Sequence, residues 1–422
     1  MKDIHLSTES YKGVRDFLPK DMAIQRYIFD TWSKTAETFG YVRYEASILE
    51  PSELYKSKGA TNEEIVNEQT YTFTDRGERE VTLRPEMTPT VARMIAGLRR
   101  ELSFPVRWYS IPNLFRYERP QRGRLREHWQ LNCDLFGTDD YTADVEVIAL
   151  AYQLLIDFGA TPEMFEIRIN DREVMRVFYA SLGITDTEII TAITRLNDRK
   201  RKLTPEEYHT GLMEITQDIQ ITEEIITRIE NTTHDTTVMS GLNALGITNI
   251  VFDPALARGF DYYTGTIFEV FDISGVNNRS LIGGGRYDNL TSMFSDEPIS
   301  GIGFGMGDVT MRDFLTTHGL LEGKVPVCAA TLTIIPAETE QNLEAQKIAL
   351  LFRNRDVKTA VDMSTKKLGK KIADAAKQQV NYILVVGSDE IASSTFTLKN
   401  LTLESSETGS IDELLASLIA HL

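Results

Sequence analysis

The sequence predicts an α+β protein in which an antiparallel sheet is interrupted by a helical insertion and followed by a separate α/β domain. Three observations lead to this fold class: strand-like runs joined by a hairpin before residue 127, a strand-poor helical region over residues 172–247, and strands that alternate with helices after Gly323. A chain of 422 residues also exceeds the size of one hydrophobic core. We therefore expect two or three domains.

The first part of the chain begins with a helix and continues as strands. Apolar residues at helical spacing predict a helix over residues 21–39, which Asp21 can cap and Gly40 can end. The turn at residues 75–78, Asp-Arg-Gly-Glu, predicts a hairpin. The expected strands are Val42–Glu50, Thr70–Asp75, Glu80–Leu83 and Val106–Tyr117, and a second helix is expected over Thr142–Phe158. Strands joined by hairpins, with helices outside them, indicate an antiparallel sheet.

The rest of the chain divides into three parts. Residues 172–247 are helical and polar, whereas strand signals return at Asn249–Phe252 and Phe268–Phe271, so an insertion into one sheet explains this order better than a tandem domain. After Gly323 the expected strands are Val325–Ile335, Val357–Val361 and Tyr382–Val386, and the expected helices are Glu338–Arg353, Leu368–Gln379 and Ile411–His421. The predicted boundaries are 1–171 and 248–323 for the two parts of the core, 172–247 for the insertion and 325–422 for the α/β domain.

The net charge of −17 argues against nucleic-acid binding over the whole surface, but it permits a local site. Residues 107–126 form such a basic segment, with six arginines, one acid (Glu118) and a net charge of +5. Cys133 and Cys328 predict buried free thiols, and no Cys or His spacing predicts a metal site. Neither a signal peptide nor a membrane-spanning run is seen, so we expect a cytoplasmic protein with no membrane partner.

Two segments carry the most specific chemistry. Residues 256–264 have the sequence LARGFDYYT and residues 281–288 have the sequence LIGGGRYD, so each places an arginine, tyrosine and a carboxylate beside glycine. Glycine lets a backbone approach a ligand closely, and Arg258 and Arg286 can bind a carboxylate or a phosphate through two parallel hydrogen bonds. Each segment alone could be an ordinary strand or turn. Together they favour a ligand site.

Two further segments indicate nucleotide chemistry. Residues 115–126 have the sequence FRYERPQRGRLR, in which Arg116 and Glu118 are expected to share one face of a strand before Pro120 and Gly123 form an arginine-rich loop. A solvated basic loop is the alternative. Residues 301–307 have the sequence GIGFGMG, so one face of a strand would carry no side chains. Such a face suits a flat adenine or a closely packed helix.

These segments resemble the motifs of one enzyme family. FRYERP at residues 115–120 is similar to motif 2 of class II aminoacyl-tRNA synthetases, and the glycine strand at 301–307 resembles their motif 3. RGFDYY and GGGRYD resemble the two histidine-specific motifs of histidyl-tRNA synthetases, and residues 83–88 and 12–19 resemble further stretches of that family. The resemblance covers nearly the whole chain. It implies a class II synthetase-like catalytic core, a helical insertion and an α/β anticodon-binding-like domain.

The resemblance also implies an activity: ATP-dependent attachment of histidine to tRNA(His) through a histidyl-adenylate. ATP with Mg²⁺ is the implied substrate, no tightly bound cofactor is expected, and a homodimer is expected. The implied catalytic residues are Arg258 and Arg116. The residues implied for histidine are Glu86, Thr88, Gln130, Asp134, Arg258, Tyr262, Tyr263 and Tyr287. Those implied for ATP are Arg116, Glu118, Arg124 and Arg258, and those for the acceptor end of the tRNA are Gln121, Arg122 and Arg126.

This chain departs from the family pattern at three places. The family usually has glutamate where Asp134 stands, motif 1 usually has a proline where Ala46 and Ser47 precede Ile48, and motif 3 usually ends in an arginine where Thr310 stands. The nearest candidate to replace that arginine is Arg312.

Two other functions compete with this interpretation. The regulatory subunit of ATP phosphoribosyltransferase is a non-catalytic protein that resembles the same core, but it lacks the anticodon-binding domain that residues 325–422 resemble. A class II synthetase for proline or threonine is disfavoured by the RGFDYY and GGGRYD segments.

Overall fold

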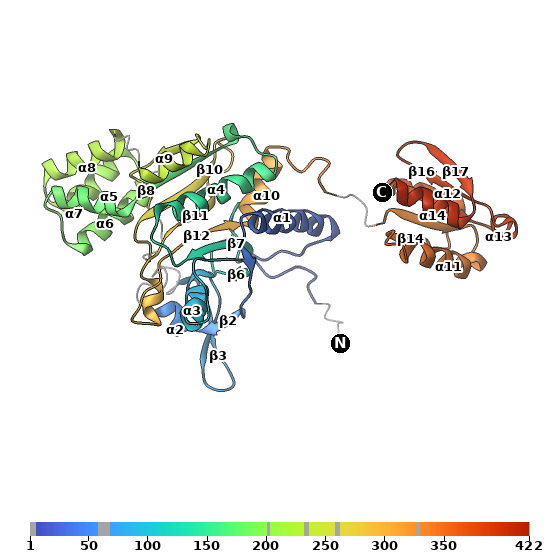
Figure 1. Cartoon of the computed structure of the whole chain (residues 1–422), viewed down its shortest axis with the longest axis horizontal. Coiled ribbons are helices and arrows are strands. Elements are labelled where there is room, and N and C mark those ends of the chain that lie inside the picture. Colours follow the sequence, from blue (N-terminus) through green and yellow to red (C-terminus); the bar gives the residue numbers. More distant parts are fainter. Residues whose placement is uncertain are drawn as a thin grey trace. The chain divides into compact units, whose positions relative to one another are not determined.

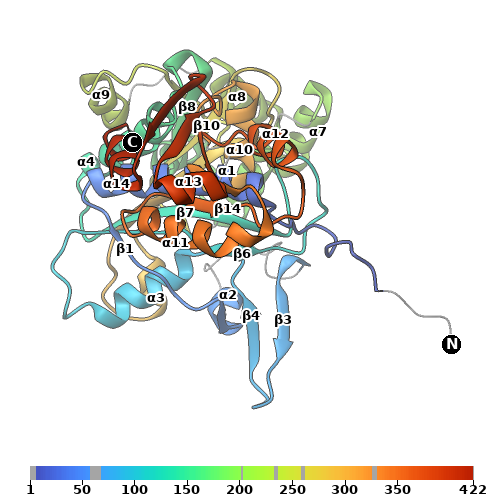
Figure 2. The same ribbon diagram turned by 90° about the vertical axis from the view of Figure 1, so that its right-hand side faces the viewer.

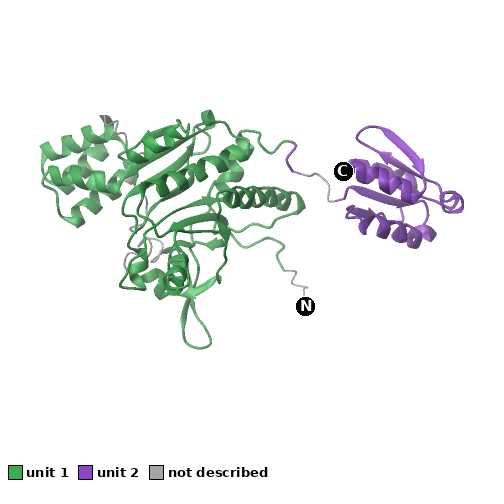
Figure 3. Cartoon of the chain, viewed as in Figure 1, with its two compact units in different colours: residues 1–322 green, residues 323–422 purple. Residues whose placement is uncertain are grey.

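The computed structural model describes residues 6–57, 68–200, 203–231, 236–257, 262–325 and 330–421. The chain divides into two compact units, residues 1–322 and residues 323–422 (Figure 3). Each unit has its own sheet and its own buried apolar cluster. Because each unit buries its own core, each is expected to be stable by itself.

Unit 1 is built on a large mixed sheet. In the described part of the chain, nine strands form it in the order β1-β5-β7-β12-β11-β10-β8-β9, with β6 paired to β7. Neighbouring strands are antiparallel except at the two ends, where β1–β5 and β8–β9 are parallel. The strands are β1 (Val42–Arg43), β5 (Val106–Ser110), β6 (Asn113–Phe115), β7 (Glu127–Phe136), β8 (Phe165–Asp171), β9 (Ile250–Phe252), β10 (Thr266–Asp272), β11 (Ser280–Arg286) and β12 (Gly301–Gly307). The sheet confirms the predicted α+β class, with a parallel pair at each end.

Helices cover one face of this sheet. Three of them pack on the central strands and share one apolar core with them (Figure 1). They are α1 (Pro19–Thr38), α4 (Tyr141–Asp157) and α10 (Asp308–Thr317). The first helix buries Ile28, Trp32 and Ala36, which are four residues apart and therefore lie on one side of it. Asp308 is also buried, and it accepts hydrogen bonds from Arg15, Gln25 and the Trp129 N–H, which fixes the start of α10 against β7.

A small three-stranded antiparallel sheet, in the order β2-β4-β3, carries the predicted hairpin (Figure 2). At its turn, Asp75 Oδ1 accepts hydrogen bonds from the N–H groups of Gly77 and Arg79. The prediction of one strand over residues 42–50 was wrong, because this segment contains two short strands, β1 and β2, that belong to different sheets. The elements of this region are β2 (Leu49–Pro51), α2 (Glu53–Lys56), β3 (Tyr71–Thr74), β4 (Glu80–Leu83) and α3 (Thr88–Leu98).

The strand expected over residues 106–117 was also wrong. Pro112 lacks the N–H that a continuing strand would need, and the chain is interrupted between β5 and β6. Arg116 and Glu118 lie beyond β6 and not on a strand; the Arg116 N–H donates to the carbonyl of Arg126 across the loop. Sequence patterns missed the central strand β7, because its residues His128, Gln130 and Asn132 are polar and line a cavity rather than the core.

Helices occupy the chain between β8 and β9. These two strands are neighbours in the sheet, with Ile167 opposite Ile250, so the chain leaves the sheet at one strand and returns beside it. Four of the helices gather beyond this end of the sheet (Figure 1) around buried residues that include Tyr179, Tyr208 and Leu212. The helices are α5 (Arg172–Ser181), α6 (Thr187–Arg199), α7 (Pro205–Thr216), α8 (Ile219–Asn231) and α9 (Thr237–Ala244), and α9 packs on α4.

Unit 2 has a five-stranded sheet in the order β14-β13-β15-β16-β17. The first two pairs are parallel and the last two antiparallel. Its elements are β13 (Leu332–Pro336), α11 (Asn342–Arg353), β14 (Thr359–Val361), α12 (Leu368–Lys377), β15 (Tyr382–Val386), α13 (Ser388–Ser393), β16 (Phe396–Asn400), β17 (Ser405–Gly409) and α14 (Ile411–Ala420). The predicted alternation of strands and helices is confirmed up to β15, whereas the hairpin of β16 and β17 was not predicted.

Candidate active site

The face of the large sheet opposite the helices carries a cavity of about 730 Å³. Alternate residues of a strand point to opposite faces, and β7 shows this clearly. Leu131, Cys133 and Leu135 are buried in the core under the helices, whereas Gln130 and Asn132 line the cavity. The buried free thiol predicted for Cys133 is confirmed, and Cys328 lies outside the described residues.

The glycines of β12 make room for side chains of neighbouring strands. A Cβ on Gly301 would lie 2.6 Å from Cε2 of Tyr287, and one on Gly305 would lie 2.7 Å from the amide of Gln130. A Cβ on Gly303 would overlap Oδ1 of Asp134 and lie 2.9 Å from the Tyr287 hydroxyl. The bare face predicted from the sequence is therefore occupied by side chains of β7 and by Tyr287, which directly follows β11.

Asp134 and Tyr287 form a buried pair beside the cavity. Tyr287 lines the cavity, and its hydroxyl donates a short hydrogen bond to Asp134 Oδ1. Burial raises the pKa of Asp134 to about 7, although the hydrogen bond from Tyr287 opposes this rise. Within the described residues Oδ2 of Asp134 has no hydrogen-bond partner. A buried carboxylate oxygen without a partner is suited to accept a hydrogen bond from a ligand.

A second buried carboxylate, Glu86, lies in the loop between β4 and α3. It is 3% exposed and accepts a hydrogen bond of 3.1 Å from the Tyr262 hydroxyl. Thr88, at the start of α3, lines the cavity beside it. The rings of Tyr262, Tyr263 and Tyr287 lie against one another, with centroids 4.8 to 6.5 Å apart. Aromatic walls and two carboxylates thus enclose one part of the cavity.

The arginines of the 116–126 segment have different surroundings. Arg116 lines the cavity, and its Nε donates to the carbonyl of Pro85 at 2.8 Å. Arg124 forms a close ion pair with Glu118 in the cavity wall. Arg122 is exposed at the rim with Gln121 and donates to Asn277 at 3.0 Å. The segment is therefore an ordered part of the cavity wall rather than a solvated basic loop.

Arg126 does not line the cavity. Only 9% of it is exposed, and its guanidinium lies 3.9 Å from the ring centroid of Tyr117 and donates to the Tyr11 hydroxyl at 3.0 Å. The expected contact of Arg126 with the acceptor end of the tRNA is not supported by this position. Its contacts instead hold the N-terminal segment against the loop.

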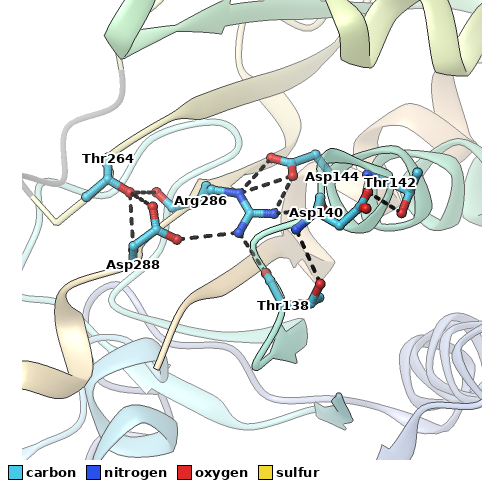
Figure 4. Close-up of polar contacts among 7 residues, drawn as sticks. All are labelled: Thr138, Asp140, Thr142, Asp144, Thr264, Arg286 and Asp288. Atoms are coloured by element: carbon cyan, nitrogen blue, oxygen red, sulfur yellow. Dashed lines mark hydrogen bonds and ion pairs between the residues drawn. The ribbon is translucent and has the colours of Figure 1, made fainter. Parts of the chain in front are cut away.

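Arg286 is also a structural residue, contrary to the ligand-binding role that its sequence context suggested. Its guanidinium forms a buried ion pair with Asp144 at the start of α4, donates to the Thr138 carbonyl at 3.0 Å and reaches Asp288 at 3.4 Å (Figure 4). Thr264 joins the same group, since its hydroxyl donates to Asp288 at 2.7 Å. These contacts fasten the end of β11 to α4. Tyr287, the next residue along, therefore points to the opposite side and into the cavity.

The structure brings together most of the residues expected at the site. Those that line the cavity are Glu86, Thr88, Arg116, Glu118, Gln121, Arg122, Arg124, Gln130, Tyr262, Tyr263 and Tyr287. Asp134 lies directly behind Tyr287, and Arg258 lies outside the described residues. The prediction that Arg312 replaces the missing arginine of motif 3 was wrong, because Arg312 faces α1 and pairs with Asp21 at 2.5 Å.

Sequence reasoning missed two basic residues of the cavity, His128 and Arg279. Burial, together with the neighbouring arginines 116, 15 and 124, lowers the pKa of His128 to about 3, so its imidazole is neutral. The polar half of β7 signals His128, because His128, Gln130 and Asn132 alternate with apolar residues. Arg279 ends a polar stretch before the GGGRYD segment, and no local pattern distinguishes it.

In the described part of the chain, no group of three or more Cys, His, Asp or Glu residues could hold a metal ion. The described helices also include none that is long and apolar enough to span a membrane.

Comparisons with known proteins agree over the whole chain. The histidyl-tRNA synthetase family profile matches residues 13–308, and the anticodon-binding domain profile matches residues 331–421. A histidine–tRNA ligase of Leptospira biflexa is 40% identical over 440 aligned residues that span all of both chains. One of Thermoplasma volcanium is 33% identical and spans 97% of this chain and 98% of its own. These relatives favour a synthetase over the regulatory-subunit alternative.

Solved structures share the fold. The crystal structure of histidyl-tRNA synthetase from Nostoc sp. PCC 7120 matches with a TM-score of 0.82 at 23% identity, and the match covers 99% of this chain and 100% of that one. The apo enzyme of S. aureus matches with a TM-score of 0.74 at 24% identity, over 97% and 99% of the two chains. The family profile and the relatives show that the chain belongs to the histidyl-tRNA synthetase family and is an aminoacyl-tRNA ligase.

Proposed function

We propose that the cavity of unit 1 joins histidine to AMP and transfers it to tRNA(His), and that unit 2 binds the anticodon region of that tRNA. The observation that carries the histidine assignment is the pair of buried carboxylates, Glu86 and Asp134, each held by a tyrosine hydroxyl. Free histidine offers two groups that suit them, an ammonium and an imidazole N–H. An amino acid without an imidazole would leave the hydrogen bond that these buried carboxylates offer to the substrate side chain unmade. The site can therefore discriminate strongly between histidine and other amino acids.

Glu86, Thr88 and Gln130 are proposed to bind the α-amino group. Asp134 accepts a hydrogen bond from the imidazole, and Tyr262, Tyr263 and Tyr287 enclose the ring. This arrangement is supported by the free Oδ2 of Asp134 among the described residues and by the contacts of the three tyrosine rings. The shorter aspartate can replace the usual glutamate, because Gly303 lets its side chain and the Tyr287 hydroxyl approach β12 closely.

The proposed reaction needs no nucleophile from the protein. A carboxylate oxygen of histidine attacks the α-phosphorus of ATP, the bond to the β-phosphate oxygen breaks, and pyrophosphate leaves. A ribose hydroxyl of the tRNA then attacks the acyl carbon and AMP leaves. Arg116 is proposed to neutralise charge on the α-phosphate, a role that a rigidly held guanidinium suits. Arg258 is predicted from the family motif to act with it.

The remaining parts of the proposal concern the partners. ATP enters as its Mg²⁺ complex, with the Glu118–Arg124 pair beside it in the cavity wall. The exposed residues Gln121 and Arg122 at the rim are proposed to meet the acceptor end of the tRNA. A homodimer and a cytoplasmic location are proposed from the family resemblance alone.

Histidine-dependent ATP–pyrophosphate exchange by the full chain tests this function. Exchange is expected with histidine and not with proline or threonine. Equal stimulation by those amino acids, or none by histidine, would contradict the proposal. Asp134→Ala is expected to lower kcat/KM for histidine by ten-fold or more, since a hydrogen bond to a charged group contributes about 1.5–3 kcal/mol. Asp30→Ala, which removes an exposed carboxylate on α1, is the matched control and is expected to have no effect.

A further inference from the structure

Arg279 lies in the cavity wall, in the connection from β10 to β11. Its neighbourhood is the place where the chain lacks the arginine that usually ends motif 3. A Cβ on Gly123 would lie 2.9 Å from Cδ of Arg279 and 3.5 Å from Cγ2 of Thr310. Gly123 has φ +71° and leaves this space open. The side chains of Arg279 and Thr310 thus both lie close to Gly123 of the 116–126 loop.

The connection that carries Arg279 is anchored on both sides. Asn277 donates to Asp272 at 2.6 Å and to Thr317 of α10 at 3.2 Å, and it accepts a hydrogen bond from Arg122 at 3.0 Å. The backbone near Arg279 is therefore tied both to α10 and to the opposite loop. A guanidinium on such a support is positioned before any ligand arrives, which reduces the entropy lost on binding.

The guanidinium of Arg279 has no hydrogen-bond or ion-pair partner among the residues that the structure describes. Burial lowers the pKa of Arg279. The other arginines of the cavity are engaged differently: Arg124 pairs with Glu118, Arg116 donates to the Pro85 carbonyl, and Arg122 donates to Asn277. A partly buried cation without a carboxylate is stabilised by an anionic ligand, and a guanidinium matches phosphate oxygens in two parallel hydrogen bonds.

The position of Arg279 along the cavity indicates which part of the ligand it meets. Gly303 of β12 lies against Asp134 and Tyr287, and Gly305 lies against Gln130. A Cβ placed on Gly307 would lie 3.5 Å from Oγ1 of Thr310. Gly307 lies four positions after Gly303 on the strand, which is about 13 Å at 3.3–3.4 Å per residue. Arg279, which approaches Gly123 together with Thr310, therefore lies near the Gly307 end of β12 and away from the proposed imidazole site. In the proposed arrangement of the substrates, this end takes the phosphates beyond the α-phosphate.

We propose that Arg279 binds the β- and γ-phosphates of ATP and so replaces the arginine missing at Thr310. The inference rests on the proposed function, because it takes the direction of the substrates in the cavity from it. Arg312, the nearest basic residue in the sequence, cannot take this role, since it faces α1 and pairs with Asp21.

The test is Arg279→Met in the full chain, which keeps an unbranched apolar stem beside Gly123 and removes the charge. The KM for ATP in histidine-dependent exchange is expected to rise at least ten-fold, and the KM for histidine to change less than two-fold. Inhibition by AMP, which lacks the β- and γ-phosphates, is expected to be unchanged. Arg312→Ala is the matched control and is expected to leave all three values unchanged.

Three outcomes would overturn the inference: a KM for ATP within two-fold of wild type, an AMP inhibition constant that rises as much as the KM for ATP, or an equal effect of Arg312→Ala. Thermal melting with and without ATP reports folding and nucleotide binding independently of exchange. Loss of the ATP-induced rise in melting temperature in Arg279→Met alone supports the inference even if wild type lacked histidine-dependent exchange. That lack would count only against the proposed function.

Discussion

Gly303→Ala is expected to damage histidine recognition more than any other single methyl group added to β12. Its Cβ would overlap Asp134 Oδ1 and would lie 2.6 Å from the carbonyl oxygen of Cys133 and 2.9 Å from the Tyr287 hydroxyl. Ordinary C···O contacts are about 3.3–3.6 Å. The carbonyl belongs to the backbone of the neighbouring strand, so it cannot rotate away, and the Asp134–Tyr287 pair must shift.

The size of the effect follows from what the pair is proposed to do. A misplaced Asp134 loses a hydrogen bond between a charged acceptor and the imidazole, which contributes about 1.5–3 kcal/mol. This loss corresponds to a decrease of roughly 10- to 150-fold in kcat/KM for histidine at 1.36 kcal/mol per factor of ten. Overpacking of the strand adds about 1–3 kcal/mol of destabilisation. The KM for ATP at saturating histidine is expected to change little, because the nucleotide end of the cavity lies about 13 Å away along β12.

ATP–pyrophosphate exchange with varied histidine, and then with varied ATP, measures both effects. Gly97→Ala is the control, because it makes the same chemical change at an exposed position of α3, where the added Cβ would meet no described atom within 4 Å beyond its own helix backbone and chain neighbours. That variant is expected to keep both KM values and to gain about 0.5–1 kcal/mol of stability. If Gly303→Ala kept a wild-type kcat/KM for histidine, the Asp134–Tyr287 pair would not recognise the imidazole.

Three further predictions concern stability and the role of unit 2. Because burial raises the pKa of Asp134 to about 7, above the value of about 3.9 in an unfolded chain, its protonated form favours folding. The stability of wild type relative to Asp134→Asn should therefore fall by roughly 2–4 kcal/mol between pH 4 and about pH 8 and stay constant above that. A pH-independent difference in melting temperature would show an ordinary pKa. Arg286→Ala should destabilise unit 1 by about 3–5 kcal/mol, because it leaves Asp144 buried without its partner, and unchanged thermal melting would rule out this contribution. A chain that ends at residue 322 should still form the adenylate but aminoacylate tRNA poorly, and equal charging by the full and shortened chains would contradict an anticodon role for unit 2.

Local patterns were sufficient for much of the fold. Helical patterns predicted α1, α4, α11, α12 and α14, because each buries apolar residues, whereas the short helix α13 was missed. A short apolar run predicted β15, and a strand-like run after the hairpin turn predicted β4, both with their observed bounds. β7 was missed because its cavity side is polar, and β17 was missed because it is an exposed strand without apolar residues. A strand is recognised from sequence by what it buries, so strands that line a site or an edge give a weak signal.

The sequence by itself determined that arginines, tyrosines, carboxylates and regularly spaced glycines belong to one site, since those residue types and spacings are a local property of each segment. The tertiary structure alone decided which of them face the cavity. Arg286 and Tyr287 are adjacent in sequence, yet one fastens β11 to α4 and the other meets Asp134, because successive residues of a strand point to opposite faces. Arg279 and Thr310 both approach Gly123, while Arg312, on the same helix as Thr310, pairs with Asp21 of α1. These choices depend on contacts between segments far apart in the chain, and no local pattern encodes which face of a strand or helix its distant neighbours will cover.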